Sequence, residues 1–221
     1  MDIFYLDSRN FFSVEDEIIK YFGKDFKSEK RKREHAFGRF LVKTVAENFY
    51  GALNSSIAIK DSKPYFLNCS LQFSISHSRN IILVAFDNNP VGIDIEFMKE
   101  RNFHQIFRYY KLNIEHPDKE LFYHFWTSYE ARIKLHQDPV SYCSFKLFDE
   151  FMLSIVSSES LDISRILRIY ELKRPNASTN PSELINLKLV SASNPKENTV
   201  VIQEINTASY EFLEPLNLKT E

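Results

Sequence analysis

The segment Val91–Phe97 constrains the fold of this chain most, because apolar and polar residues alternate along its second half. Successive side chains of a β-strand point to opposite faces, so the odd-numbered apolar residues would enter a core while Asp94 and Glu96 share the other face. Two carboxylates held that close are costly unless a cation lies between them. A hard, oxygen-preferring ion such as Mg²⁺ suits that position, usually with a phosphate substrate. The alternative is a solvent-facing acidic side of an edge strand.

A second segment, Glu120–Leu135, predicts a helix that carries another acid and a lysine. Its apolar residues recur at helical spacing and predict one buried stripe, which consists of Phe122, Phe125, Trp126, Tyr129 and Ile133. Glu130 and Lys134 flank this stripe four residues apart. Taken alone they form a surface ion pair worth about 0.3–0.5 kcal/mol. Taken with the acids of Val91–Phe97, they offer a third carboxylate and a cation for a phosphate.

The composition excludes several classes of function. The chain has 221 residues, a net charge of −2 and only four Gly. This charge gives no electrostatic case for nucleic-acid binding, and the few Gly exclude a P-loop or a dinucleotide-binding fingerprint. Cys69 and Cys143 fit free thiols in a reducing compartment. The acidic N-terminal residues do not fit a signal peptide, and no apolar run approaches the roughly 18 residues of a membrane span. We therefore expect a soluble, cytoplasmic protein without membrane partners.

The order of predicted elements indicates an α+β or mixed α/β fold. A helix capped by Ser28 runs to about Tyr50, and two more helices are predicted over Phe103–Tyr110 and Glu120–Leu135. Strands are predicted over Leu71–Ser76, Ile81–Phe86, Val91–Phe97, Ser144–Phe148, Phe151–Val156, Ile166–Leu172 and Thr199–Ile205. This order is compatible with two similar halves, although no internal sequence repeat demonstrates them.

Three segments in this order, Phe73–Ser78, Val91–Glu96 and Phe125–Lys134, resemble the motifs of 4′-phosphopantetheinyl transferases, and Lys63–Tyr65 resembles the Lys-Pro element of that family. The chain is most similar to the Sfp-type, the larger single-chain class. The resemblance implies transfer of the phosphopantetheine arm of coenzyme A to a serine of an apo acyl or peptidyl carrier protein, releasing adenosine 3′,5′-bisphosphate. It also implies a monomer with two similar α/β halves, a pseudo-dimer that binds coenzyme A in the cleft between them. We place the halves at about 1–98 and 99–221.

The resemblance assigns the acids to metal binding and catalysis. Asp94, Glu96 and Glu130 would bind Mg²⁺, with Mn²⁺ as an alternative ion, and the metal would bridge to the pyrophosphate of coenzyme A. Glu130 would also activate the carrier serine, directly or through water. Lys134 would hold phosphate oxygens and offset the charge that develops during transfer.

Other matching residues would bind coenzyme A. His77 would donate to phosphate oxygens as a protonated imidazole, with Ser76 hydrogen-bonding nearby and Lys63 as a further phosphate contact. Arg33, in the densest basic run of the chain, is the residue that we expect at the 3′-phosphate. The neighbouring charges of Glu34 and Arg39 leave the register of this assignment open.

The chain departs from the family pattern at three positions. Tyr129 stands where the family has a lysine before the glutamate, Ser62 stands where Gly commonly precedes Lys-Pro, and Leu135 follows Lys134 in place of Gly. Loss of that lysine motivates a second hypothesis, a non-catalytic module that binds coenzyme A or carrier proteins. A third hypothesis, a different metal-dependent phosphate enzyme such as a nuclease, conflicts with the near-neutral charge.

Overall fold

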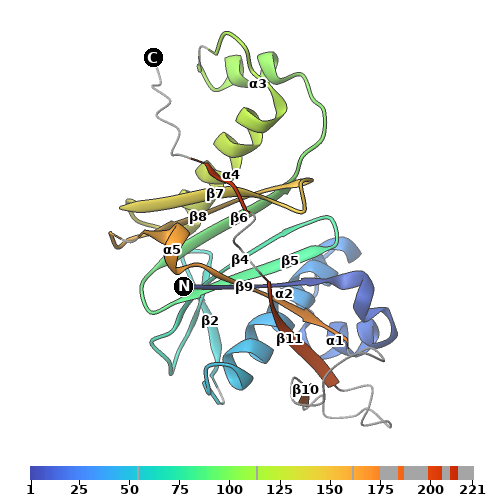
Figure 1. The fold of residues 1–221 in the computed structure, drawn as a ribbon. Helices are drawn as coiled ribbons and strands as arrows, with labels where there is room; N and C mark the ends of the chain where they lie inside the picture. The colour runs from blue at the N-terminus through green and yellow to red at the C-terminus, as the bar shows by residue number, and fades with distance from the viewer. Residues whose placement is uncertain are drawn as a thin grey trace.

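The computed structural model describes residues 1–53, 55–112, 114–160, 162–174, 184–186, 199–205 and 210–213. They form an α+β fold, as the sequence predicts, with two main sheets and helices on the outer face of each (Figure 1). The strands Val91–Phe97 and Thr199–Ile205 are found as predicted, and the bounds of the other predicted strands lie within three residues of those observed. None of the described helices is long and apolar enough to cross a membrane.

The larger sheet contains residues from both ends of the chain. Its neighbours are antiparallel, except that the first strand of the chain pairs in parallel with β9. The strand order is β10 (Leu184–Asn186), β11 (Thr199–Ile205), β9 (Arg168–Lys173), β1 (Asp2–Asp7), β5 (Ile81–Asp87) and β4 (Gln72–Ser78). Helices α1 (Glu15–Phe22) and α2 (Glu29–Asn48) cover one face of this sheet (Figure 1).

The smaller sheet is antiparallel throughout and lies against the other main sheet. Its strand order is β12 (Phe212–Leu213), β7 (Ser141–Leu147), β8 (Phe151–Ser157) and β6 (Val91–Phe97). Helix α4 (Lys119–Leu135) packs on its outer face, with α3 (Phe103–Tyr109) beside the beginning of α4. The shorter elements are a 3-10 helix η1 (Ser8–Val14), a hairpin of β2 (Ile57–Lys60) and β3 (Lys63–Phe66), and a one-turn helix α5 (Ile163–Ile166).

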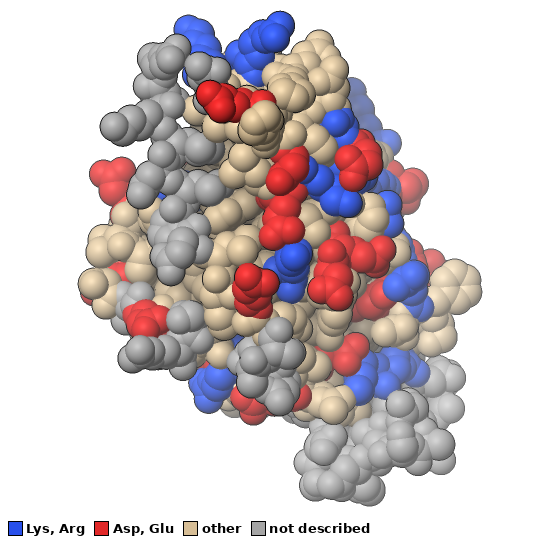
Figure 2. Space-filling view, turned by 45° about the horizontal axis from the view of Figure 1, so that its top comes forward, with Lys and Arg blue, Asp and Glu red and all other residues tan. Residues whose placement is uncertain are grey.

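The molecule is therefore layered as helices, sheet, sheet and helices. One apolar core fills the space between α2 and the larger sheet, and includes Phe4, Phe37, Phe40 and Phe73. A second core lies between the two sheets, where Leu83 of β5 meets residues of β6 and β8. Burial of these side chains stabilises the packing at about 25 cal/mol per Å² of apolar surface. On the face shown in Figure 2, basic and acidic residues are interspersed, in keeping with the small net charge.

The two sheets do not follow the expected boundary between residues 98 and 99. Strand β6 precedes that boundary but pairs with β8, whereas β9 and β11 follow it and belong to the sheet that contains β1. Segments of the chain thus cross between the layers in both directions. The pseudo-dimer of similar halves stays a prediction.

The predicted apolar stripe of α4 is wrong in its second half. Tyr129 and Ile133 are 44% and 51% exposed, although Tyr129 stacks on Phe125 with ring centroids 6.1 Å apart. The face turned toward the sheet carries smaller side chains in their place, including Thr127 and Ala131, both fully buried. The reason is a close approach of helix and strand, described below, that leaves no room for large residues.

Candidate functional site

Asp94 occupies the edge strand of the smaller sheet, where the alternation of β6 predicts it. The residue is 6% exposed. Its Oδ1 accepts hydrogen bonds from Ser76 Oγ at 2.7 Å and from Lys134 Nζ at 2.6 Å. Its Oδ2 is buried without a hydrogen-bond partner among the described residues. An unpartnered buried carboxylate oxygen costs free energy, and a bound cation would remove that cost.

Glu96 and Glu130 lie close enough to Asp94 to feel its charge. Burial raises the pKa of Glu96, and the Asp94 carboxylate raises it further. The same two causes, in the same order, raise the pKa of Glu130, while Lys134 opposes them. The structure therefore brings the three predicted acids into one neighbourhood. Within the part of the chain that it describes, however, no three acidic, imidazole or thiol groups are arranged to hold a metal ion, so the metal site stays a prediction.

Lys134 pairs with Asp94 across the helix–strand interface. Its Nζ also donates to Ser76 Oγ at 2.9 Å, so helix α4 and strands β4 and β6 meet at this ammonium. The i, i+4 spacing on the helix favours an ion pair of Lys134 with Glu130, but in the structure Lys134 pairs with Asp94 instead. The lysine thus stands beside the acids, where the resemblance expects a phosphate-binding cation.

Gly92 sets the distance between α4 and β6. A Cβ at this position would lie 2.1 Å from the carbonyl oxygen of Ala131 and 2.9 Å from the amide nitrogen of Leu135. Only glycine permits this approach. Beneath the same helix, the hydroxyl of Ser154 is hydrogen-bonded to those of Thr127 and Ser144, each at 2.7 Å. Small residues on both sides thus hold Glu130 and Lys134 over Asp94.

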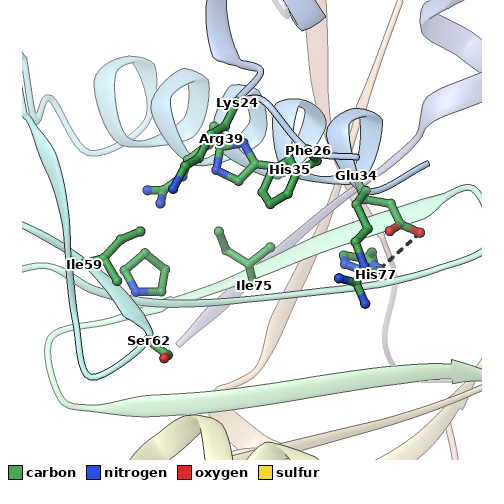
Figure 3. A pocket seen from close by; sticks show the side chains of 12 residues that line it. Lys24, Phe26, Glu34, His35, Arg39, Ile59, Ser62, Ile75 and His77 are labelled. Carbon is green, nitrogen blue, oxygen red and sulfur yellow. Dashed lines mark ion pairs between the residues drawn. The ribbon is translucent and has the colours of Figure 1, made fainter. Parts of the chain in front are cut away.

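His77 lies on the opposite face of β4 from Ser76, at the edge of a pocket. Its Nδ1 is 3.6 Å from Glu34 Oε1, the pair marked by a dashed line in Figure 3. Desolvation lowers the pKa of His77, and Glu34 partly offsets this effect. The direction works against the protonated imidazole that the sequence prediction invokes, so an anionic ligand would have to favour that form.

The pocket beside His77 has a volume of about 560 Å³ and lies between α2, β4 and the β2–β3 hairpin. Five basic or imidazole side chains line it, His77 and four others, together with apolar groups such as Ile59, Ile75 and Phe26. The four others are Lys24, Arg31, His35 and Arg39. Sequence reasoning assigned none of them to a ligand and noted Arg39 only as a neighbouring charge of Arg33. Arg31, His35 and Arg39 are spaced at i, i+4 and i+8, which places them on one face of a helix. This spacing could have identified them from the sequence.

Arg39 contributes a guanidinium to the lining of this pocket. Its Nη1 is buried and has no hydrogen-bond partner within the described ranges. Burial lowers the pKa of its guanidinium. A guanidinium presents several donors in a planar fork that matches phosphate, so a phosphate in the pocket would satisfy this group.

Two predicted phosphate contacts have protein partners instead. Arg33 pairs with Glu15, with Nε 2.7 Å from Oε1, and lines a separate pocket of about 380 Å³. Lys63 donates from Nζ to the carbonyls of Val91 at 3.2 Å and Leu135 at 3.4 Å, and burial lowers the pKa of its ammonium. Lys63 thereby ties the end of α4 to β6, a contact that no sequence motif predicts.

Comparison with known proteins supports the resemblance seen in the motifs. No family model matches the chain. A 4′-phosphopantetheinyl transferase of Bacillus subtilis is 36% identical over 109 residues, which cover 44% of this chain and 49% of that protein. The Sfp transferase of Bacillus subtilis strain 168 is 32% identical over 110 residues, with the same coverage. A putative 4′-phosphopantetheinyl transferase of Haemophilus influenzae is 31% identical over 138 residues, 57% of each chain. The match thus spans about half the length of these curated relatives, and it confirms the similarity to Sfp-type transferases.

Proposed function

We propose that this chain, similar over about half its length to 4′-phosphopantetheinyl transferases, transfers 4′-phosphopantetheine from coenzyme A to a serine hydroxyl of an apo acyl or peptidyl carrier protein. One observation carries the proposal. On β4, Ser76 hydrogen-bonds to the buried Asp94, while the next residue, His77, lines the basic pocket. Two adjacent residues of β4 thus contact the acids and the pocket, which suits a ligand that has both a nucleotide and a reactive pyrophosphate.

In the proposed reaction, the serine oxygen forms a bond to the phosphorus that carries the pantetheine arm. The bond from this phosphorus to the bridging oxygen breaks, and adenosine 3′,5′-bisphosphate leaves with that oxygen. The serine proton would go to Glu130, directly or through water. Lys134, already beside Asp94, would stabilise negative charge on the phosphate oxygens.

The oxygen donors of the site fit Mg²⁺ in chemistry. Asp94, Glu96 and Glu130 would hold the ion, and Asp94 Oδ2, buried without a hydrogen-bond partner among the described residues, would be one of its ligands. When bound, Mg²⁺ or Mn²⁺ would neutralise charge on the pyrophosphate. Because the three acids do not already form a cluster that could hold a metal, binding would require their carboxylates to draw together.

The pocket of Figure 3 would take the adenosine 3′,5′-bisphosphate part of coenzyme A. Its apolar residues can contact a base, and its cations can contact phosphates. We favour Arg39 over Arg33 at the 3′-phosphate, because Arg39 lines this pocket whereas Arg33 pairs with Glu15 and lines a separate one. The chain would act as a cytoplasmic monomer, with coenzyme A and the carrier as its partners.

The proposal is tested by intact mass spectrometry of several apo carrier proteins incubated with the chain, coenzyme A and Mg²⁺. We expect a mass gain of one phosphopantetheine group that EDTA prevents. Asp94→Ala and Glu130→Ala should abolish the gain in folded protein, because each removes a group from the reacting centre. Coenzyme A binding without transfer to any carrier would instead favour the binding module, and normal turnover in either variant would contradict the site assignment.

A second experiment tests the 3′-phosphate assignment. Affinities for coenzyme A and for 3′-dephospho-coenzyme A are measured by calorimetry in the wild type, Arg39→Gln and Arg33→Gln. Loss of a charge-assisted hydrogen bond to phosphate is worth about 1.5–3 kcal/mol, so Arg39→Gln should weaken coenzyme A binding about 10- to 150-fold. Binding of the dephospho form should change little. The opposite ranking of the two variants would restore Arg33.

A further inference from the structure

The two main sheets meet along a pair of edge strands that do not pair through their main chains. Strand β4 ends the larger sheet and β6 ends the smaller one. The main-chain partner of β4 is β5, and that of β6 is β8. The amides along one side of β6 therefore need acceptors from another source, because unpaired buried amides are costly.

Three alternate serines of β4 supply those acceptors. The hydroxyl oxygens of Ser74, Ser76 and Ser78 accept from the amides of Ile93 at 3.2 Å, Ile95 at 3.3 Å and Phe97 at 2.9 Å. All three serines are buried, with exposures of 4%, 4% and 8%. Each step of two residues on β4 matches a step of two on β6, so the contacts form a regular serine ladder.

Two steps of the serine ladder also donate to the acids of the site. Ser76 Oγ donates to Asp94 Oδ1 at 2.7 Å, and Ser78 Oγ donates to Glu96 Oε2 at 3.1 Å. The corresponding position opposite Ser74 is Gly92, which has no side chain to receive a bond. Ser74 and Ser78 thus make the same contact with the main chain of β6, but Ser78 alone of these two also holds an acid.

We propose that Ser78 is a positioning residue that fixes the Glu96 carboxylate for cation binding. Its hydroxyl accepts from one residue of β6 and donates to the preceding one, so the orientation of the carboxylate is fixed relative to its own strand. Hydrogen bonds to ligating carboxylates orient them, and their loss typically weakens metal binding about 10- to 100-fold. This inference rests on the proposed function for the identity of Glu96 as a ligand.

The test compares Ser78→Ala with its matched control, Ser74→Ala. Binding of Mn²⁺ is measured by electron paramagnetic resonance in the presence of coenzyme A, and unfolding by urea is measured in parallel. Both variants lose an amide acceptor and should be destabilised to a similar extent. We expect the Mn²⁺ dissociation constant to rise about 10- to 100-fold in Ser78→Ala and to stay at the wild-type value in Ser74→Ala. Ser78→Thr, which keeps a hydroxyl, should restore it.

A double-mutant cycle with Glu96→Ala sharpens the test. If Ser78 acts through Glu96, Ser78→Ala should have no further effect on Mn²⁺ binding once Glu96 is removed. Equal effects of Ser74→Ala and Ser78→Ala, or absence of Mn²⁺ binding in the wild type, would overturn the inference. Failure of the proposed function would give a different result. The wild type would transfer nothing to carriers, while Ser78→Ala would still weaken Mn²⁺ binding.

Discussion

Substitution of Gly92 by alanine should separate α4 from β6 and disable the site without touching a reacting group. The added Cβ would lie 2.1 Å from the Ala131 oxygen, and Cβ contacts below 3.0 Å are essentially never observed. The helix must therefore retreat by about 0.9 Å, the difference between these two distances. If the whole retreat falls on the bond between Lys134 and Asp94, its 2.6 Å length becomes about 3.5 Å, beyond the range of a good N–H···O hydrogen bond.

Two effects of known magnitude follow from this displacement. Overpacking of a buried interface costs about 1–3 kcal/mol, which for a chain of this size lowers the melting temperature by about 2–12 °C. Misplacement of catalytic groups by about 1 Å can cost about 100-fold in rate. Gly92→Ala should therefore be folded but less stable, with transfer to apo carrier reduced about 100-fold.

The assay combines thermal unfolding with intact mass spectrometry of the carrier, and Gly51→Ala is the control. Gly51 has a φ of +65° and no atom within 4 Å of an added Cβ. Alanine there costs about 1–2 kcal/mol through the left-handed backbone alone. This control should lose similar stability and keep full activity. Wild-type stability and transfer in Gly92→Ala would refute the claim that this glycine sets the helix position.

Two further predictions concern a buried histidine and a half-buried lysine. Burial lowers the pKa of His124, 5% exposed on α4, to about 4. The unfolded imidazole, with its ordinary pKa of about 6.5, binds a proton that the folded one does not. The free energy of unfolding should therefore fall by about 1.4 kcal/mol per pH unit as pH drops from about 6.5 toward 4. Urea unfolding at several pH values measures this slope, and His124→Gln should lack the contribution of this residue. Lys63→Met should lower the free energy of unfolding by about 1–3 kcal/mol, because two carbonyls lose a charged donor, and leave affinity for coenzyme A unchanged. Weaker coenzyme A binding at wild-type stability would instead support the phosphate contact predicted from the sequence.

Local periodicity accounts for the parts of the fold that the sequence predicted well. The alternation along Val91–Phe97 correctly places its isoleucines in the core between the sheets and Asp94 on the other face. The N-cap at Ser28 is also confirmed, since its side chain accepts from the Arg31 amide. Pairing between distant segments has no such local signal. Strand β1 was therefore not predicted, and β9 was predicted as a strand without its parallel partner β1.

The outer face of α4 was mispredicted because apolarity was equated with burial. The helix carries more large apolar residues than its interface can hold, and Gly92 brings the sheet too close for them. Alanine and threonine fill the interface, so Tyr129 and Ile133 remain exposed. The size of the facing residues decided which side of the helix is buried, and those residues lie about 40 positions away in the chain.

The geometry of β4 explains how motifs that are separate in sequence form one candidate site. Because side chains alternate along a strand, Ser76 and Ser78 turn toward the acids of β6, while Ile75 and His77 turn toward the basic pocket. A single ligand that reaches both regions must cross the edge of β4 between His77 and Ser76. In coenzyme A the pyrophosphate separates the nucleotide from the pantetheine arm, so this crossing is where the proposed function requires the reacting phosphorus to lie. Under the proposed function, Ser76, His77 and Ser78 would join nucleotide binding to phosphoryl transfer, because their neighbouring side chains point to opposite faces of β4.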